Sequence, residues 1–265
     1  MIRVKIWGGL GNQLFQYAFA KGIEYKYGLE VQLENTWYKR QSDQGTHRDF
    51  ILDRLNCRCN LAAYGDTRRC NNVFNEEPLN VMSHACDDTY YVGYWQNPVY
   101  FDFIYSSLIN EFTLTETEKE KFMPGLKNCI KGIISGNSVS LHVRRTDYLS
   151  LSDYPICTVS YYKKGVSLIR EIIGNCDIYV FSDDMKWTTN NITYFKECNI
   201  HYISTGDDVI DWYLMSLCKH HVIANSTYSW WAARIGGEQG ITVMPKNWLH
   251  SDNHECLRCK GWINI

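Results

Sequence analysis

The chain has 265 residues, with 27 basic and 29 acidic side chains and a formal charge of -2. This balance excludes the broad basic surface that binds nucleic acid or an anionic membrane, so any anion site must be local. The sequence opens without the basic region and apolar run of a signal peptide, and no apolar run reaches the roughly 18 residues that would cross a bilayer. We therefore expect a cytoplasmic protein without a membrane anchor, large enough for one large domain or two modest ones.

The first residues predict a β-α-β unit. Apolar residues alternate in the segment 2–7, and Gly8-Gly9-Leu10-Gly11-Asn12-Gln13 then predicts a tight turn that opens a helix. That helix keeps apolar residues at i, i+4 spacing and ends near Gly28, after which residues 31–34 predict a second strand.

The glycine turn also permits a different class of protein. Gly9 and Gly11, with Glu34 at the end of the second strand, form part of a dinucleotide-binding signature, so an NAD-dependent oxidoreductase is one alternative. Leu14 stands where the third glycine of that signature belongs. The other use of such a turn is to let a ligand approach bare backbone.

The middle of the chain is less informative. Residues 36–88 are polar and rich in predicted loops, and a strand is predicted at 89–96. The charged segment 116–131 has a helical pattern that Pro124 should break. We place a domain boundary after it, which gives an N-terminal α/β domain at 1–134 and a C-terminal α/β domain at 135–265.

The second half alternates strands and helices, which is typical of a parallel, doubly wound sheet. The predicted strands are 137–143, 177–181, 200–203, 221–224 and 241–244, and the predicted helices are 161–173, 209–217 and 229–235.

The strand at 137–143 leads directly into Arg144, Arg145, Thr146 and Asp147. Ligands of open α/β sheets bind beyond the carboxyl ends of the strands, so a guanidinium there can hold an anion. Arginine suits a phosphate because its planar fork donates two parallel hydrogen bonds and stays charged. The alternative is a surface ion pair between Arg144 and Asp147.

A second candidate site follows the strand at 221–224. Asn225, Ser226 and Thr227 open a helix, whose free N–H groups and positive dipole end suit a phosphate, although Ser226 or Thr227 could serve only as the helix cap. Asp211 begins the preceding predicted helix. Its carboxylate could accept two hydrogen bonds from guanine, or it could be an acid that the helix dipole favours.

Taken together in this order, four motifs resemble the family 11 glycosyltransferases, the α-1,2-fucosyltransferases that use GDP-L-fucose, and the resemblance spans residues 2 to about 248. Thr146 stands where that family usually has glycine. The related α-1,6 fucosyltransferases also carry threonine in this loop. The motifs are Gly8-Gly9-Leu10-Gly11-Asn12-Gln13-Leu14-Phe15-Gln16-Tyr17-Ala18, Gly93-Tyr94-Trp95-Gln96, His142-Val143-Arg144-Arg145-Thr146-Asp147 and Asn225-Ser226-Thr227-Tyr228-Ser229-Trp230-Trp231-Ala232-Ala233.

The resemblance implies an α/β fold of the GT-B kind, with two Rossmann-like domains facing a central cleft. The C-terminal half would hold GDP-fucose and the N-terminal half a galactose-terminated glycan. Arg144 would bind the β-phosphate, and Asn12 would lie near the reacting sugar, beside Gly9 and Gly11. The remaining donor contacts would come from His142 and Asp211 at the guanosine and from Asn225, Ser226 and Thr227 at the diphosphate.

The reaction expected from the resemblance is inverting transfer without a metal. No Asp-x-Asp motif occurs in the sequence, so Arg144 rather than a cation would stabilise the departing diphosphate. Asp147 and Asp153 are the candidate bases. A fucosyltransferase of another linkage and a carbohydrate-binding protein without catalysis stay open, as does peripheral contact with a lipid-linked glycan.

Eleven scattered cysteines indicate reduced thiols rather than a disulfide framework. Cys57 with Cys59 and Cys256 with Cys259 could offer thiolates to zinc, but their spacings match no common zinc motif. We therefore expect no metal site and no cofactor.

Overall fold

The computed structural model describes residues 1–41, 47–63, 70–75, 88–237, 240–251 and 255–265. They form two compact units, Met1–Thr115 and Glu116–Ile265. The helix α3 (Glu116–Ser135) groups with the second unit because it packs against β5 and α6, and a Cβ on its Gly132 would come within 2.8 Å of the Tyr179 hydroxyl. The units therefore divide before α3, whereas the sequence placed the domain boundary after it.

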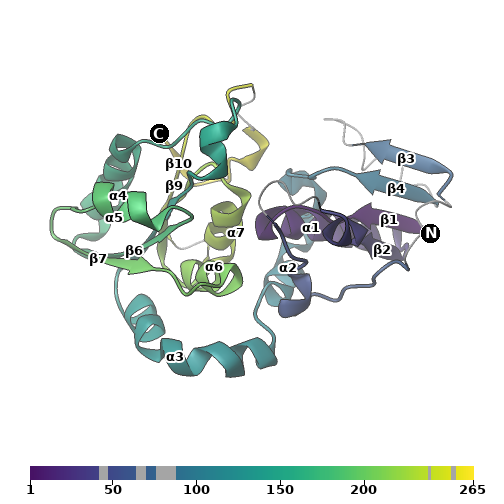
Figure 1. The fold of residues 1–265 in the computed structure, drawn as a ribbon, viewed down its shortest axis with the longest axis horizontal. Helices are drawn as coiled ribbons and strands as arrows, with labels where there is room; N and C mark the ends of the chain where they lie inside the picture. The colour runs from purple at the N-terminus through teal and green to yellow at the C-terminus, as the bar shows by residue number, and fades with distance from the viewer. Residues whose placement is uncertain (42–46, 64–69, 76–87, 238–239, 252–254) are drawn as a thin grey trace. The chain divides into compact units, whose positions relative to one another are not determined.

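The first unit is built on a four-stranded parallel sheet of order β2-β1-β4-β3 (Figure 1). The strands are β1 (Ile2–Lys5), β2 (Val31–Glu34), β3 (Asn72–Asn75) and β4 (Thr89–Val92). The strand β3 lies in the region where the sequence predicted loops. Three of its four residues are exposed at the sheet edge and its apolar residues, Val73 and Phe74, are adjacent, so it lacks the alternation that marks a half-buried strand.

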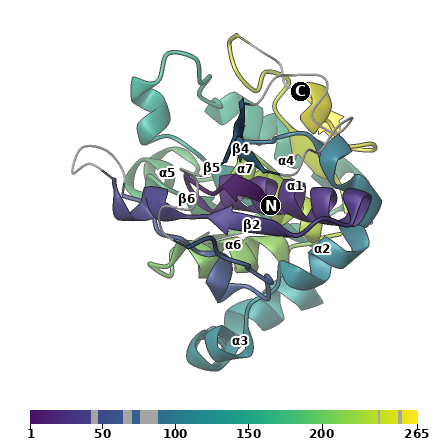
Figure 2. The same cartoon turned by 90° about the vertical axis from the view of Figure 1, so that its right-hand side faces the viewer.

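Helix α1 (Leu10–Tyr27) lies along this sheet beside β1 and β2, as Figure 2 shows. It ends at Gly28, which takes the left-handed conformation expected of a helix cap. Aromatic side chains of the unit pack around it, with Phe19 stacked on Trp95 at 4.1 Å between ring centroids. The short helix α2 (Tyr105–Glu111) and the single 3-10 turns at Thr36–Lys39, Leu52–Arg54, Pro98–Tyr100 and Asp102–Ile104 complete the unit.

The second unit contains a six-stranded parallel sheet of order β10-β9-β8-β5-β6-β7. Figure 1 shows α4 and α5 on one face of this sheet and α6 and α7 on the other. The strands are β5 (Ser138–Val143), β6 (Cys176–Ser182), β7 (Cys198–Ile203), β8 (His220–Val222), β9 (Thr242–Met244) and β10 (Ile263–Asn264). The helices are α4 (Val159–Ile173), α5 (Met185–Asn191), α6 (Asp208–Ser216) and α7 (Thr227–Ile235).

This strand order is that of a dinucleotide-binding α/β sheet, and it confirms the doubly wound sheet that the sequence predicted. From β5 the chain proceeds to β6 and β7 on one side, and then returns to β8 and continues to β9 and β10 on the other. The order therefore reverses between β5 and β8. Ligands of such sheets bind beyond the carboxyl ends of the two strands that flank the reversal.

One helix differs from its prediction. Helix α3 runs without a break from Glu116 to Ser135 with Pro124 inside it, so the break predicted at Pro124 was wrong. Most of α3 is at least partly exposed, and Ile133 is its only fully buried residue, so water can satisfy the carbonyl that proline leaves unbonded.

Among the described residues, every helix is too short or too polar to span a membrane.

Candidate functional site

The candidate site lies where the sheet order of the second unit reverses. The Arg144 loop follows β5, and Asn225 and Ser226 follow β8 and lead into α7. All six residues of β5 are buried. The sheet thus brings the two segments that the sequence singled out to adjacent strand ends.

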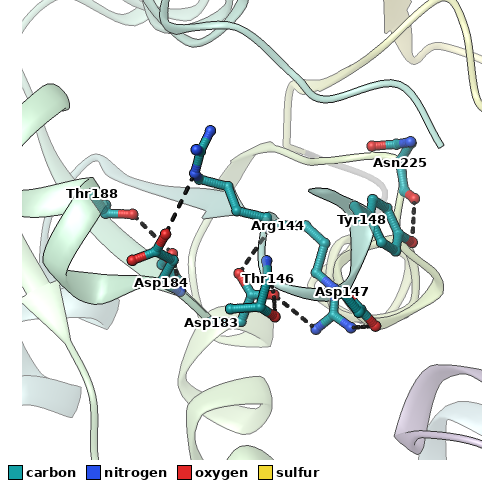
Figure 3. Close-up of polar contacts among 10 residues, drawn as sticks. Arg144, Thr146, Asp147, Tyr148, Asp183, Asp184, Thr188 and Asn225 are labelled. Atoms are coloured by element: carbon teal, nitrogen blue, oxygen red, sulfur yellow. Dashed lines mark hydrogen bonds and ion pairs between the residues drawn. The ribbon is translucent and has the colours of Figure 1, made fainter. Parts of the chain in front are cut away.

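Arg144 is held between two carboxylates. Its Nη2 lies 2.5 Å from Asp147 Oδ2, and its Nη1 lies 3.3 Å from Asp183 Oδ2. Figure 3 shows the side chain pointing toward both acids. Burial alone would lower the pKa of the guanidinium, but Asp183 and Asp147 outweigh it and raise that pKa. The buried Nε–H has no hydrogen-bond partner within the described part of the chain, so Arg144 retains a donor for a ligand.

Asp183 holds the loop that carries Arg144. Its carboxylate accepts the backbone N–H of Arg145 at 2.9 Å and that of Thr146 at 3.1 Å, and also the Thr146 hydroxyl at 2.6 Å. The sequence analysis gave Asp183 no role. The available signal was that it directly follows β6, which pairs with β5, so the carboxyl ends of the two strands meet.

The second arginine of the motif points elsewhere. Arg145 Cζ lies 3.8 Å from the centre of the Trp187 ring in α5, and Arg145 Nε lies 3.5 Å from Asp184 Oδ2. Arg145 therefore packs the loop against α5.

Tyr148 connects the Arg144 loop to the segment after β8. Its hydroxyl donates to the backbone carbonyl of Asn225 at 3.0 Å, and its ring lies 5.3 Å from Arg144 Cζ (Figure 3). Burial raises the pKa of Tyr148, so its hydroxyl stays protonated and remains a donor. This contact could not be predicted from local pattern, because it joins residues 77 positions apart.

The side chain of Asn225 forms hydrogen bonds within the protein. Its amide nitrogen donates to the carbonyls of Pro155 at 3.0 Å and Trp248 at 2.9 Å, and its oxygen faces the Cys157 thiol at 3.7 Å. Both amide hydrogens are thus already donated. We assign this side chain a structural role, in place of the diphosphate contact that the sequence suggested.

Ser226 and Thr227 begin α7 as expected. Ser226 is the N-cap residue with extended backbone, and its side chain makes no capping hydrogen bond. The first turn of α7 contains no acid. The Ser226 side chain therefore does not cap α7, and the dipole of the helix favours an anion at this end.

His142 is a buried, neutral histidine one residue before the end of β5. Burial, with a smaller effect from Arg144, lowers its pKa to about 3, although Asp183 opposes the shift. Its ring lies 5.4 Å from that of Tyr228 in α7. Within the described residues its Nδ1 has no hydrogen-bond partner. A neutral imidazole in this position can accept or donate one hydrogen bond to a ligand.

Two further candidates, Asp211 and Asp153, lie elsewhere in the same unit. Asp211 is in the first turn of α6, where it accepts the backbone N–H of Thr205 at 3.0 Å and its hydroxyl at 2.8 Å. Burial raises the pKa of Asp211. Asp153 accepts the backbone N–H and the hydroxyl of Ser251, at 2.7 and 2.6 Å. Both oxygens of Asp153 are therefore bonded within the protein, which favours Asp147 as the candidate base.

Gly9, Gly11 and Asn12 belong to the first unit, at the start of α1. Gly8, rather than Gly9, has the positive φ of 80° that requires glycine. Gln96 Nε2 donates to Asn12 Oδ1 at 3.1 Å, so the second and first motifs are in contact.

Glu34 does not fit a dinucleotide site. It is 5% exposed, and its carboxylate accepts the Tyr90 hydroxyl at 2.8 Å and the backbone N–H of Thr36 at 2.8 Å. A carboxylate buried with these bonds is not available for the ribose hydroxyls of NAD. The oxidoreductase alternative therefore lacks the acidic residue that would bind the ribose.

The arrangement can bind an anion and stabilise growing negative charge, because a fixed cation and a helix N-terminus flank the same reversal of the sheet. No cluster of metal-ligating side chains occurs among the residues that the structure describes. Eight of the described cysteines are free thiols: Cys57, Cys59, Cys70, Cys129, Cys157, Cys176, Cys198 and Cys218.

Known proteins similar in sequence share one activity class. The model of the family "Glycosyl transferase family 11" matches residues 70–265. An O-antigen biosynthesis glycosyltransferase, WbnK, of Escherichia coli is 28% identical, with 97% of this chain and 98% of that protein covered. An α-1,2-colitosyltransferase of Escherichia coli is also 28% identical, with 95% and 93% covered. The galactoside 2-α-L-fucosyltransferase Sec1 of Mus musculus is 27% identical over 96% of this chain and 68% of its own.

Solved structures place the fold among the GT-B fucosyltransferases. The fucosyltransferase NodZ from Bradyrhizobium has a TM-score of 0.53 at 10% identity, with 87% of this chain and 91% of NodZ covered. FUT1 of Arabidopsis thaliana, solved in complex with GDP, has a TM-score of 0.53 at 12% identity, with 93% and 71% covered. At these identities the likeness concerns the fold alone.

Proposed function

This chain belongs to glycosyl transferase family 11, and from that premise we propose that it transfers L-fucose from GDP-β-L-fucose to the 2-hydroxyl of a terminal β-galactoside with inversion. The first relatives named above act in O-antigen biosynthesis or transfer a deoxy sugar to form α-1,2 linkages. The acceptor in this proposal is a galactose-terminated glycan of an O-antigen or capsule-like polysaccharide.

One observation carries the proposal. The guanidinium of Arg144 lies at the end of β5, between Asp147 and Asp183, and Tyr148 connects its loop to the residues that begin α7. Sheets of this order bind nucleotides at this point. A GDP-sugar needs donors for its diphosphate, and the Arg144 side chain and the first turn of α7 supply them.

The chemistry follows from the leaving group. The acceptor oxygen forms a bond to C1 of fucose while the bond from C1 to the phosphate oxygen breaks, and GDP leaves with the bonding electrons. Donors fixed beforehand stabilise the charge that develops on the β-phosphate, because they need no rearrangement during the reaction. In this proposal Arg144 and the N–H groups of Thr227 and Tyr228 do so.

The proton of the attacking hydroxyl must pass to a base. Asp147 is our candidate, because its carboxylate lies beside Arg144 and Asp153 is bonded to Ser251. His142, kept neutral by burial, and Asp211 would contact the guanosine. In the first unit, Asn12 would contact the sugar.

A second donor is favoured by one observation. The colitosyltransferase matches 95% of this chain at the same identity as WbnK. Colitose is fucose without the 3-hydroxyl, so the two GDP-sugars offer the same diphosphate and differ in one hydrogen-bonding group. Parallel assays with GDP-fucose and GDP-colitose decide between them by kcat/KM.

The test is release of GDP from GDP-fucose with and without a β-galactoside, followed by methylation analysis and NMR of the product. We expect GDP release that depends on the acceptor and a product with α-1,2-linked fucose. A product with a different linkage would still support a fucosyltransferase but would reject the 2-hydroxyl as the acceptor position. Binding of sugar with no release of GDP from either donor would favour the non-catalytic alternative.

We also propose that the reaction needs no divalent cation, because the sequence offers Arg144 where an Asp-x-Asp enzyme would place a metal. Transfer measured in EDTA should equal that measured in Mg²⁺ or Mn²⁺ within about twofold, whereas a metal-dependent enzyme loses several kcal/mol of charge stabilisation.

A further inference from the structure

Aromatic side chains gather at the carboxyl edge of the sheet in the first unit. Trp7 follows β1, Trp37 lies in the turn after β2, and Tyr94 follows β4. Because β2, β1 and β4 are adjacent and parallel, their carboxyl ends lie at one edge. This is the edge at which α/β sheets bind their ligands.

The rings form an ordered stack. Trp7 and Tyr94 are 4.6 Å apart between centroids and 9° from parallel, and the Nζ of Lys5 lies 4.8 Å from the centre of the Trp7 ring. Trp37 meets the Trp7 ring edge-on at 6.5 Å and 75°. The Trp7 indole N–H donates to the Gly93 carbonyl at 3.3 Å, which ties the ring of β1 to the segment that carries Tyr94. Trp7 thus supports Tyr94 from behind.

Tyr94 is nevertheless 40% exposed. Stacking on Trp7 therefore leaves a large part of this ring in contact with solvent, where a ligand can reach it. The exposed part of the ring is flat and fixed, and it therefore forms a platform on which a ligand can stack without first ordering the side chain.

A strained residue fixes this platform. Trp95 has a φ of 55°, in the left-handed region that bulky residues avoid. Its ring is fully buried and stacked on Phe19, 4.1 Å away and 6° from parallel. The buried ring therefore anchors a sharp turn, with Tyr94 on one side and Gln96, which donates to Asn12, on the other. Strain of this kind persists only where the surrounding structure over-determines the backbone, and strained residues cluster at active and ligand-binding sites.

We propose that Tyr94, supported by Trp7, is a stacking subsite for one pyranose ring of the acceptor glycan, with a galactose ring as its occupant. The inference rests on the proposed function, since it names the part of the protein that would bind that acceptor. Galactose has an apolar face made by the C–H groups of C3, C4 and C5, which suits an aromatic ring, and hydroxyls at its rim that suit the amides of Gln96 and Asn12.

The experiment compares four variants by two measurements. Tyr94→Ala removes the ring, Tyr94→Phe keeps it, and Trp7→Ala removes its support. Tyr25→Ala is the matched control, because Tyr25 is 71% exposed near the far end of α1. The first measurement is titration of methyl β-D-galactopyranoside and lactose by protein-observed NMR with GDP present. The second is the rate of GDP release from GDP-fucose into water without acceptor.

We expect Tyr94→Ala to weaken galactoside binding by about tenfold, the effect of a lost aromatic stack, and Trp7→Ala to weaken it by at least about threefold. Tyr94→Phe and Tyr25→Ala should bind within about twofold of the wild type. The control Tyr25→Ala should also release GDP into water at the wild-type rate. If Tyr94→Ala binds galactoside as the wild type does, or if the wild type does not bind it, the subsite is refuted.

The binding measurement does not need catalysis, so it separates the two proposals. A protein that binds galactoside through Tyr94 but releases no GDP keeps the subsite and rejects the proposed function. A protein that transfers fucose with an acceptor KM unaffected by Tyr94→Ala keeps the function and rejects the subsite.

Discussion

Asp183→Asn is the substitution that tests the candidate site most directly, because Asp183 follows the neighbouring strand β6 and contacts the Arg144 loop. The carboxylate accepts two backbone N–H groups and one hydroxyl from residues 145 and 146, and it lies 3.3 Å from Arg144. Asparagine has nearly the same shape but only one acceptor oxygen. Whichever way its amide is turned, an NH₂ group faces at least one N–H donor.

The size of the effect can be worked from these contacts. A hydrogen bond to a charged group contributes about 1.5–3 kcal/mol, and the better amide orientation loses one of them, at the Arg145 N–H. The remaining bonds weaken because the acceptor becomes neutral, and the ion pair with Arg144 is lost. The total is roughly 3 kcal/mol. When Arg144 is displaced and the activation free energy rises by this amount, the rate falls about a hundredfold.

The assay is steady-state GDP release, with kcat/KM measured for GDP-fucose, and the affinity for GDP measured by calorimetry. Asp184→Asn is the matched control. Asp184 caps α5 by accepting the Trp187 N–H at 3.0 Å, and asparagine caps a helix equally well. The control should therefore stay within about threefold of the wild type. Circular dichroism and urea unfolding would establish that both variants are folded at the assay temperature.

The reasoning about Asp183 would be refuted by an Asp183→Asn enzyme that is folded and retains more than about a third of the wild-type kcat/KM. It would also fail if Asp184→Asn lost as much activity as Asp183→Asn, since the effect would then belong to the α5 region as a whole.

Three other predictions follow from single residues. Arg144→Lys should lower kcat/KM for GDP-fucose by about 10²-fold or more with an unchanged fold, because an ammonium cannot reproduce the fork; an enzyme that retains a tenth of the wild-type turnover would remove Arg144 from this role. His142 has its pKa lowered to about 3 by burial, so the unfolded chain gains a proton below its ordinary pKa of 6.5 while the folded chain does not, and the stability it contributes is complete above about pH 6.5 and is lost as the pH falls toward 3. Between pH 7 and pH 5 the free energy of unfolding should therefore fall by up to about 2 kcal/mol more in the wild type than in His142→Gln, as measured by urea unfolding. The control His250→Gln, at an exposed position, should match the wild type. Gly8→Ala should lower the free energy of unfolding by about 1–2 kcal/mol, because φ is 80° and the new Cβ would lie 3.0 Å from Asn12, whereas Gly9→Ala, with φ of -78° and its nearest contact at 3.9 Å, should cost less than half as much.

Much of the architecture was predictable because it depends on local pattern. The helices and strands between residues 138 and 244 follow apolar periodicity, and Gly28 and Ser226 mark helix ends by their residue type. The position of Arg144 at a strand end was predictable for the same reason. The pattern could not show a strand with no buried face, as in β3. Nor could it show that α3 tolerates Pro124 because the helix is largely exposed to solvent.

The candidate site was only partly predictable, because its polar groups find partners through strand order. Asp183 and Arg144 meet because β6 pairs with β5, and nothing in the sequence around residue 183 states that pairing. Asn225 lies beside the candidate site, and its amide donates to Pro155 and Trp248, which lie 70 residues before it and 23 after it and which the local sequence does not indicate. The unused Nε–H of Arg144 and the neutral state of His142 depend on burial, which a sequence does not give residue by residue.

The bonds of Asn225 have a consequence for engineering this enzyme class. One amide fastens the loop after β8 to the segments at Pro155 and Trp248, and Tyr148 fastens the same loop to the one that carries Arg144. These four stretches therefore form a single transplantable unit. Chimaeras that exchange the loop at 225–227 alone for one without asparagine at position 225 would lose the two amide bonds to Pro155 and Trp248 and keep only the Tyr148 bond to the backbone, whereas exchange of all four stretches together would preserve them all.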